Sequence, residues 1–427
     1  MDQFAALDPK HARDHLIAAR ARLDALTADV GGAQLFGPKI EIVNPFLWEL
    51  GHVAWFQERW CLRVADGSLG ASILDGADAL YDSSAVAHWT RWHLPLASLA
   101  ETRRYLAEVL NRTLESLDSR GNDPRQIYFA ELSAAHEDMH CEAFHYMRQT
   151  LSYPAPGLGD RGETKESVPM SGDARFAGGE FLLGALPGNG FVHDNEKWAH
   201  PVRVAPFAMA RTSVINEQFR EFVEAGGYAR REFWSDDGWR WRTTTGYEAP
   251  RYWRVVPGGW EQRRFDRWVP LALDEPVLHV NWFEADAYCR FAGRRLPTEA
   301  EWEFAAQGGA EKRVFPWGDA ALDAGRANLE SASLAPVTAL AEGDTPEGVR
   351  QLMGNVWEWT ASDFLPYPGF KPDPYEDYSQ PWFGTRKVLR GGSFASPRRM
   401  LRATWRNFFT PDRADVFAGL RTCALEA

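Results

Sequence analysis

Cysteine is scarce in this sequence of 427 residues, which contains four cysteines and no Cys-x-x-Cys pair. The scarcity excludes a cysteine-based zinc site and argues against a framework of disulfide bonds. No apolar run approaches the roughly eighteen residues that a membrane-spanning helix needs, and the polar N-terminal stretch lacks the apolar core of a signal peptide. We therefore expect a soluble, cytoplasmic protein with no membrane partner.

Positive charge is also in short supply. The sequence has 47 Lys and Arg against 59 Asp and Glu, a formal net charge of −12, and no basic block offsets the excess. A surface of this sign repels nucleic acids and anionic lipids, so we expect neither as a partner. We also expect a monomer.

The first 151 residues carry four segments with apolar residues at helical spacing. These segments are 8–30, 44–65, 98–118 and 123–151. Four amphipathic helices with moderate connections are typical of a four-helix bundle, whose core often holds metal ions between facing helices. We therefore predict a helical bundle as the first domain, residues 1–151.

The rest of the chain has a different character. Residues 152–175 are rich in proline, glycine and charge, which predicts a linker. From 176 to 427, short β-like runs (178–186, 200–210, 387–396 and 416–425) alternate with tryptophan-rich loops and with two helical segments, 213–227 and 281–309. This pattern predicts an irregular, loop-rich α+β domain.

The stretch "HEDMHCEAFHYM", residues 136–147, contains two overlapping metal-binding patterns. H-E-x-x-H is the signature of zinc proteases, with Glu137 as general base, but the third ligand expected downstream does not follow. In H-x-x-x-H-x-E, residues four apart share one helix face, so His136 and His140 can bind one ion. Glu142 points elsewhere on the helix, and we expect it to orient a neighbouring helix or a ligand histidine.

A third ligand must come from another helix. His52, in the apolar stretch "WELGHVAW", is the best candidate, because an unpartnered imidazole would be costly to bury there. His145 is a spare candidate that we expect to be structural. Three neutral histidines with open coordination positions suit Zn(II) and Fe(II) equally, so the motif leaves the metal open.

From Phe176 onward the sequence resembles the formylglycine-generating enzymes, or sulfatase-modifying factors, whose fold is C-type-lectin-like. The resemblance rests on "GGEFLLGA", "PVLHVNWFEADAYCRFAGRRLPTEAEWEFAAQGG", "FPWGD", "GNVWEWTASD", "LRGGSFAS" and "FAGLR", in this order. Those enzymes use reactive cysteines shortly after the R-G-G-S run. Here "RGGSFASPRRMLRATWRN" contains none, so we expect the scaffold without that activity.

A bundle with H-x-x-x-H-x-E joined to this fold resembles the ergothioneine-type sulfoxide synthases, which attach sulfur to the imidazole of hercynine (trimethylhistidine). The resemblance implies a DinB-like bundle that binds non-haem Fe(II) through His52, His136 and His140, with O₂ as co-substrate. It also implies that Tyr375, in "PYPGFKPDPYEDYSQPWFGTRKVLRGGSF", is the catalytic tyrosine near the iron. Glu137 then has no protease role. The trimethylammonium group of hercynine favours an aromatic surround, which this sequence can supply.

Two departures from that family concern the sulfur donor. Members that use γ-glutamylcysteine have a tryptophan and an aspartate where "RNFFTPDR" has Phe408 and Phe409, while Asn407 and Arg413 match. Phenylalanine cannot pair with the ammonium group of an amino-acid donor, and losing such a pair typically costs about 2–5 kcal/mol. Met139 likewise replaces a glutamine that faces the substrate.

These departures favour the selenoneine synthases, a sister group that joins hercynine to a selenosugar. A sugar has no ammonium group and suits an aromatic stacking face such as Phe408 or Phe409. We expect Asn407 to contact hercynine, and Arg413 and Arg91 to bind the donor. The alternative is an ergothioneine-type sulfoxide synthase that uses γ-glutamylcysteine or cysteine.

A non-catalytic ligand-binding module is an alternative of another class. The formylglycine-generating-enzyme fold also occurs in ligand-binding and lectin-like proteins, and DinB-type bundles can be inert. Loss of any of the three histidines would favour that alternative. All three are present, which favours an enzyme.

Overall fold

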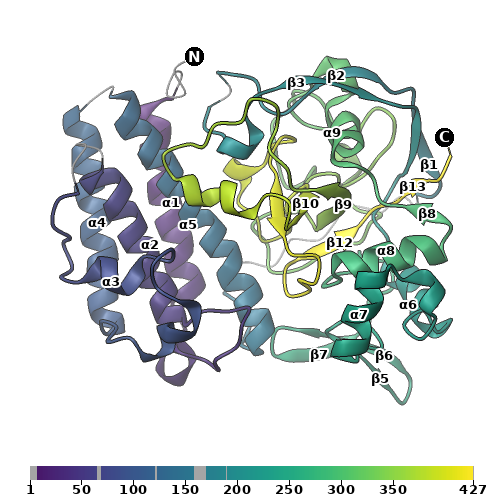
Figure 1. The fold of residues 1–427 in the computed structure, drawn as a ribbon, viewed down its shortest axis with the longest axis horizontal. Coiled ribbons are helices and arrows are strands. Elements are labelled where there is room, and N and C mark those ends of the chain that lie inside the picture. Colours follow the sequence, from purple (N-terminus) through teal and green to yellow (C-terminus); the bar gives the residue numbers. More distant parts are fainter. Residues whose placement is uncertain (1–6, 65–68, 121–122, 158–169, 189, 427) are drawn as a thin grey trace. The chain divides into compact units, whose positions relative to one another are not determined.

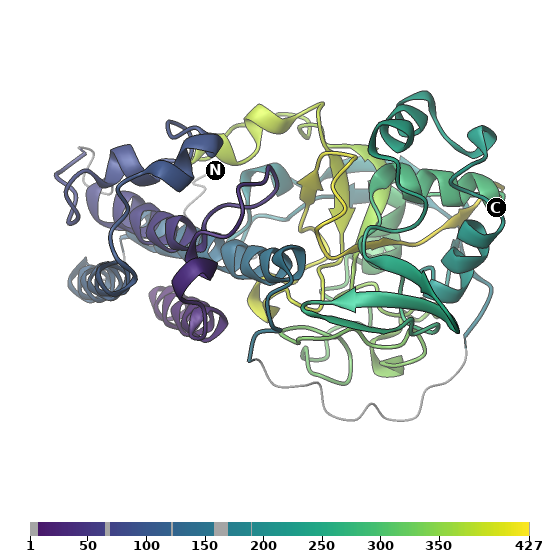
Figure 2. The same ribbon diagram turned by 90° about the horizontal axis from the view of Figure 1, so that it is seen from below.

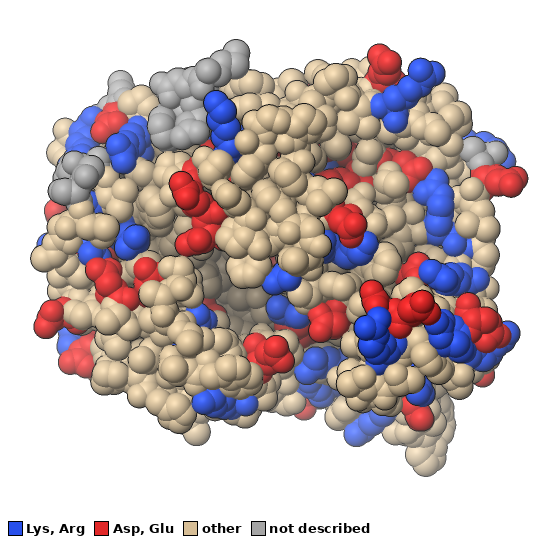
Figure 3. Space-filling view, viewed as in Figure 1, with Lys and Arg blue, Asp and Glu red and all other residues tan. Residues whose placement is uncertain are grey.

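The computed structural model describes residues 7–64, 69–120, 123–157, 170–188 and 190–426. The chain forms two compact units: unit 1 is Met1–Gly157 with Pro187–Phe191, and unit 2 is Leu158–Leu186 with Val192–Ala427. Half of the expected linker, 158–169, lies outside the described residues, and the first strand of unit 2 begins at Asp173. Acidic and basic side chains are interspersed on the face seen in Figure 3.

Unit 1 is the predicted four-helix bundle, which the structure confirms. Its long helices are α1 (Pro9–Thr27), α2 (Phe46–Glu58), α4 (Leu99–Arg120) and α5 (Pro124–Leu151), and they lie side by side (Figure 1, Figure 2). Shorter elements are η1 (Gly32–Leu35), the π-helical turn η2 (Arg59–Arg63), α3 (Ala77–Tyr81) and η3 (His88–His93). Of the helices that the structure describes, none is long and apolar enough to cross a bilayer.

The local sequence explains where these helices begin. α1 and α5 both start at an Asp-Pro pair, in which Asp8 and Asp123 accept a hydrogen bond from the backbone two residues on. Proline suits the first helical position because its missing N–H would have no partner there. Every residue of α2 is buried, as expected for a helix that is apolar on all sides. His52 lies near the middle of this buried helix.

Unit 2 contains four small sheets in the described residues. The first has the order β1 (Asp173–Phe176), β4 (Phe207–Ala210), β13 (Cys423–Ala424), β8 (Arg294–Arg295), and the second β11 (Asn407–Phe409), β10 (Lys387–Arg390), β9 (Trp357–Asp363), β12 (Ala418–Leu420). The others are the hairpin of β2 (Gly179–Leu183) and β3 (His200–Val204) and the meander of β5 (Trp253–Val256), β6 (Gly259–Arg264) and β7 (Arg267–Pro270). Only the β9–β12 pair is parallel among these ladders. This irregular α+β unit confirms the predicted fold class.

The helices of unit 2 differ from the prediction of two helical segments. The structure describes α6 (Asn216–Glu224), α7 (Asp236–Thr245), α8 (Trp282–Phe291) and α9 (Glu299–Gln307). The predicted segment 281–309 is divided into α8 and α9 because Pro297 and the short strand β8 interrupt it. Each of the two helices has its own capping box, Asn281 with Glu284 and Thr298 with Glu301.

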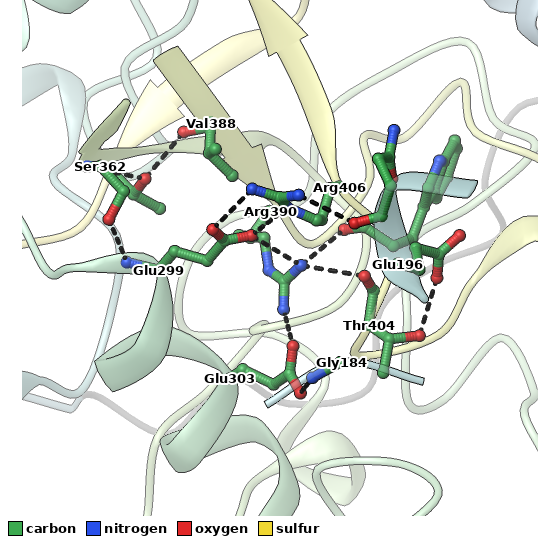
Figure 4. A network of polar contacts seen from close by, with 12 residues as sticks. Gly184, Glu196, Glu299, Glu303, Ser362, Val388, Arg390, Thr404 and Arg406 are labelled. Atoms are coloured by element: carbon green, nitrogen blue, oxygen red, sulfur yellow. Dashed lines mark hydrogen bonds and ion pairs between the residues drawn. The ribbon is translucent and has the colours of Figure 1, made fainter. Parts of the chain in front are cut away.

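A buried network of charges anchors the second sheet (Figure 4). Arg390, at the end of β10, contacts Glu303 and lies 3.3 Å from Glu299, both on α9. Arg406, just before β11, donates to the same Glu299 at 2.6 Å and to the carbonyl oxygen of Asn195 at 2.8 Å. Buried charges are tolerated when they are paired in this way. The hydrogen bonds of Arg406, the residue directly before β11, therefore fix the start of this strand.

Candidate functional site

Three histidines of unit 1 lie together between α2 and α5. His52 comes from α2, and His136 and His140 lie one turn apart on α5. One ring nitrogen of each lies within 4.8 Å of those of the other two, and His52 and His136 are buried. In the part of the chain that the structure describes, this is the only such group of three or more His, Cys, Asp or Glu residues. The structure thus brings together the three residues expected to bind a metal.

The spacing of the ring nitrogens fits a metal ion. Nε2 of His136 and Nε2 of His140 are 3.2 Å apart. Two nitrogens bound to one ion at about 2.1 Å are about 3.0 Å apart at a right angle and about 3.4 Å apart at a tetrahedral angle. The observed distance lies between these values. The donor set of three imidazoles, two of them buried, is also one that transition metals prefer.

In two of these rings, Nδ1, the nitrogen that would not bind the ion, faces a hydrogen-bond acceptor. Nδ1 of His52 lies 2.8 Å from the carbonyl oxygen of Tyr81, at the end of α3. A carbonyl can only accept, so Nδ1 of His52 carries the proton and Nε2 keeps its lone pair for an ion. Nδ1 of His140 lies 2.6 Å from Oε2 of Glu49, on α2. The third ring, His136, is stacked face to face on Phe56, with centroids 3.6 Å apart.

The local electrostatics favour a cation. Burial, together with the nearby His140, lowers the pKa of His52 to about 3, so this imidazole is neutral at pH 7. Burial raises the pKa of Glu49, but the contact with His140 outweighs burial and lowers this pKa to about 2. Glu49 is therefore an ionised carboxylate beside the histidines. A neutral ligand with a buried negative charge behind the site is a suitable environment for a divalent ion.

Glu49 itself is held by a chain of side chains that the sequence did not indicate. Nδ2 of Asn44 donates to Oε1 of Glu49 at 2.6 Å, and Arg91 donates to Oδ1 of Asn44 at 2.8 Å. Arg91 also donates to the carbonyl oxygen of Val86 at 3.1 Å, and its guanidinium lies 3.8 Å from the ring centroid of Trp48. Arg91, which we expected to bind the donor, thus makes its contacts within unit 1 and is buried.

The other residues of the "HEDMHCEAFHYM" motif have separate contacts. Glu137 forms an ion pair with Arg20 of α1, with distances of 2.8 and 3.2 Å, which removes the general base that a zinc protease would need. Glu49 of α2 is a carboxylate that contacts one of the three histidines, His140. His145 is buried with Nδ1 3.0 Å from the carbonyl oxygen of Cys141, as expected for a structural residue. Met139 is half-buried.

Glu49 could have been found from the sequence. It is a charged residue in an otherwise apolar stretch, one helical turn before His52, and a buried carboxylate needs a partner. The contact with His140 could not have been found, because it depends on the packing of α2 on α5.

In unit 2, Tyr375 lies in a loop that is anchored on both sides. Two residues before it, Asp373 forms a buried ion pair with Lys197 at 2.6 Å. Four residues after it, Ser379 donates to Asp194 and accepts from Nδ2 of Asn195 at 3.1 Å. Tyr375 is half-buried between these anchors. Its place in the loop is therefore set by fixed neighbours on either side.

The aromatic residues next to Tyr375 form a continuous group. Its ring centroid is 6.3 Å from that of Tyr378, which is stacked on His193 at 4.3 Å and lies 5.8 Å from Phe408. Phe408 is in turn stacked on Phe364, with centroids 4.0 Å apart. Phe408 therefore packs within unit 2 on at least two sides.

Four of the residues expected to bind the substrates, Asn407, Phe408, Phe409 and Arg413, lie on and just after β11. Successive strand residues point to opposite faces, so Asn407 and Phe409 share one face and Phe408 has the other. The ring of Phe409 lies 5.0 Å from the guanidinium of Arg413, and Arg413 forms two contacts with Asp415, of 2.6 and 2.7 Å. The structure thus brings Phe409 and Arg413 together and gives Phe408 a different environment.

The two cysteines of unit 2 have the properties of structural residues. Cys289 and Cys423 are both buried. Burial raises the pKa of Cys423 to about 12 and also raises the pKa of Cys289. Thiols in this state stay protonated and are poor nucleophiles. The absence of cysteine after the R-G-G-S run is therefore not compensated by these two thiols.

Comparison with known proteins agrees with this division. Residues 15–143 match the DinB superfamily, and residues 161–426 match the sulfatase-modifying factor enzyme 1-like domain. The fold and these two matches together define a class of protein in which a DinB-type helical unit is joined to a sulfatase-modifying-factor unit. The formylglycine-generating enzyme of Streptomyces coelicolor is 33% identical over 313 residues, which are 65% of this chain and 96% of that enzyme.

Relatives that match both units are more similar. The hercynine oxygenase of Mycolicibacterium thermoresistibile is 39% identical over 421 residues, covering 95% of this chain and 93% of the relative. The hercynine oxygenase of Mycobacterium tuberculosis is 38% identical over 424 residues, covering 97% and 98%. The chain belongs to the hercynine oxygenase family. As a member of a family of oxygenases, it is an oxidoreductase.

Proposed function

We propose that this protein is a non-haem Fe(II)- and O₂-dependent enzyme that forms a carbon–sulfur or carbon–selenium bond at the imidazole C2 of hercynine. The observation that carries the proposal is the cluster of His52, His136 and His140 in a chain related over nearly its whole length to hercynine oxygenases. Zinc would fit the same ligands, but an oxygenase needs a metal with redox chemistry, and zinc has none. Bound iron would supply the reduction of O₂.

The side chains around the histidines have definable tasks in this proposal. The carbonyl oxygen of Tyr81 and the carboxylate of Glu49 hold the outer nitrogens of His52 and His140. Phe56 and Trp48 stack on His136 and His52 and shield these rings from water. A dry, oriented ligand set of this kind controls the access of solvent to the ion.

Tyr375 is the proposed catalytic residue. A phenol can give up both a proton and an electron, and the anchored loop that carries Tyr375 would hold its hydroxyl in a reproducible position. With a thiol donor, the C2–H and S–H bonds break and C–S and S=O bonds form. One oxygen atom of O₂ enters the sulfoxide, and the other leaves as water with the two hydrogens. Asn407, on the same face of β11 as Phe409, is the proposed contact for hercynine.

The finer proposal concerns the donor, for which we favour a selenosugar. Two features support this choice. Phe409, which lies against Arg413, offers no acceptor for an ammonium group, and the charge of Arg413 is already balanced by Asp415. Both features reduce the attraction for a zwitterionic donor. The names of the relatives favour the second candidate, a thiol such as γ-glutamylcysteine or cysteine.

The test is a direct comparison of donors. Enzyme purified without oxygen and loaded with Fe(II) is incubated with hercynine, O₂ and γ-glutamylcysteine, cysteine or a selenosugar, and the products are identified by mass spectrometry. We expect the carbon–selenium product to form fastest. A sulfoxide from either thiol, with no product from the selenosugar, would overturn the selenosugar proposal and leave a sulfoxide synthase.

Two variants test the metal in the same assay. His136→Ala should lose both stoichiometric iron and product, whereas His11→Ala, an exposed histidine of α1, should retain both. If no donor gives a product with the iron-loaded protein, the proposed function is wrong.

A further inference from the structure

We infer that Glu49 is a positioning residue for the metal site, which selects the ring tautomer of His140 that can bind the ion. The inference rests on the proposed metal site, but it concerns a residue that is not itself a ligand. It follows from the donor and acceptor roles in a row of four side chains, each in contact with the next: Arg91, Asn44, Glu49 and His140 (hereafter the relay).

The first step is the contact at the metal end of the relay. Oε2 of Glu49 and Nδ1 of His140 are 2.6 Å apart, and both atoms are buried. Neither has another hydrogen-bond partner among the described residues. A buried carboxylate oxygen and a buried ring nitrogen are both costly without a partner, so each depends on the other.

The second step is the direction of the hydrogen bonds at the other end. A guanidinium can only donate, so the atom of Asn44 that faces Arg91 is the amide oxygen. The amide nitrogen of Asn44 then faces Oε1 of Glu49 and donates to it. The permanent charge of Arg91 therefore fixes the orientation of Asn44, which in turn fixes one oxygen of Glu49 as an acceptor.

The third step transfers this polarity to the histidine. With Oε1 held by Asn44, Glu49 presents Oε2 to His140, and an ionised carboxylate only accepts. Nδ1 of His140 must then carry the proton, which leaves the lone pair on Nε2. This is the nitrogen that lies 3.2 Å from Nε2 of His136. With the opposite tautomer, an N–H would point at His136, and the two rings would hydrogen-bond to each other instead of binding an ion.

His52 provides an internal reference. Its Nδ1 is held by the backbone carbonyl of Tyr81, which no side-chain substitution in the relay removes. The tautomer of His52 should therefore be independent of Glu49.

The decisive variant is Glu49→Gln, which keeps the shape and removes the charge. Because the nitrogen of Asn44 still donates, the oxygen of the glutamine should turn toward Asn44 and its NH₂ group toward His140. Nδ1 of His140 must then accept, so the proton should move to Nε2. Loss of such an outer partner typically weakens metal binding by about 10–100-fold, and we expect a decrease of this size.

The experiment uses the full-length protein with histidine labelled by ¹⁵N. Imidazole ¹H–¹⁵N spectra of the metal-free protein report the tautomer, and anaerobic titration with Co(II), a coloured substitute for Fe(II), reports the affinity. We expect His140 to change from the Nδ1–H to the Nε2–H form in Glu49→Gln while His52 stays unchanged. Asn44→Ser, which removes the donor to Oε1 of Glu49 but leaves residue 49 itself unchanged, should also weaken Co(II) binding. Circular dichroism verifies that each variant is folded.

A matched control comes from another carboxylate–histidine pair of unit 1. Oε2 of Glu131 on α5 lies 2.8 Å from Nδ1 of His15 on α1, outside the histidine cluster. Glu131→Gln should leave the Co(II) affinity and the tautomer of His140 unchanged. Equal Co(II) affinity of the wild type and Glu49→Gln, or an Nε2–H form of His140 in the wild type, would overturn the inference. Failure to form a product from hercynine would overturn the proposed function alone.

Discussion

Gly51 gives the most direct test of how the metal site is built. A Cβ atom at this position of α2 would lie 2.2 Å from Cε1 and 2.3 Å from Cζ of Tyr81, whose ring is completely buried. Real Cβ atoms do not approach other atoms this closely, so Gly51→Ala must displace Tyr81. The carbonyl oxygen of Tyr81 is the group that holds Nδ1 of His52, one residue along the helix from Gly51. The substitution should therefore reach the metal ligand through the backbone of α3.

The effects on stability and on metal binding should differ. Replacing a helical glycine by alanine favours folding by about 1 kcal/mol, whereas forcing extra atoms into a packed core costs about 1–3 kcal/mol. The free energy of unfolding should thus fall by no more than roughly 2 kcal/mol, the difference between these two effects. Loss of the Tyr81 contact should weaken metal binding by at least about tenfold.

Anaerobic Co(II) titration and urea unfolding of the metal-free protein measure the two quantities. The double variant Gly51→Ala/Tyr81→Leu removes the ring that clashes and keeps the backbone carbonyl, so it should recover part of the lost Co(II) affinity. If Gly51→Ala binds Co(II) as tightly as the wild type, Tyr81 does not position His52 as described.

The remaining predictions concern unit 2. Tyr375→Phe should bind iron and hercynine normally but lose bond formation or divert it to oxidation of the donor; unchanged turnover and product would make the tyrosine merely structural. Phe409→Asp should shift donor preference toward amino-acid thiols by about tenfold or more, since a paired carboxylate in a site is worth about 2–5 kcal/mol, and product ratios in mixed-donor reactions measure the shift. Burial raises the pKa of Glu284 to about 7, against 4.5 for the ordinary side chain. The stability that the protonated Glu284 contributes is therefore present below pH 4.5 and lost as the pH rises through 7. The thermal midpoint of Glu284→Gln, measured relative to that of the wild type, should therefore rise between pH 5 and pH 8. The same difference in thermal midpoint at both pH values would contradict this assignment.

The sequence was sufficient for much of unit 1. Helical spacing of apolar residues, with an Asp-Pro start at α1 and α5, located α1, α4 and α5 to within about three residues at each end. It was less informative for unit 2, where Pro297 divides a segment that we had treated as continuous. The meander of β5 to β7 and the helix α7 were also not predicted, because their sequences lack a clear apolar period.

The limits at the site have the same physical origin. His136 and His140 could be paired from the sequence, because the geometry of one helix places them together. The contacts of Glu49 with His140 and of Arg91 with Asn44 span 91 and 47 positions in the numbering, and no local pattern encodes them. The different surroundings of Phe408 and Phe409 follow from the strand register of β11, which became visible only in the structure.

The anchoring of β11 by Arg406 has a consequence for how this enzyme family can change. Arg406 holds the strand through Glu299 and the carbonyl oxygen of Asn195, and Asn195 in turn donates to Ser379 in the Tyr375 loop. Part of the support of β11 thus comes from Arg406, a residue that precedes the strand, and does not depend on the side chain of Phe409. If Phe409 faces the donor, as proposed, a substitution there can change the donor preference while the support of β11 by Arg406 stays the same.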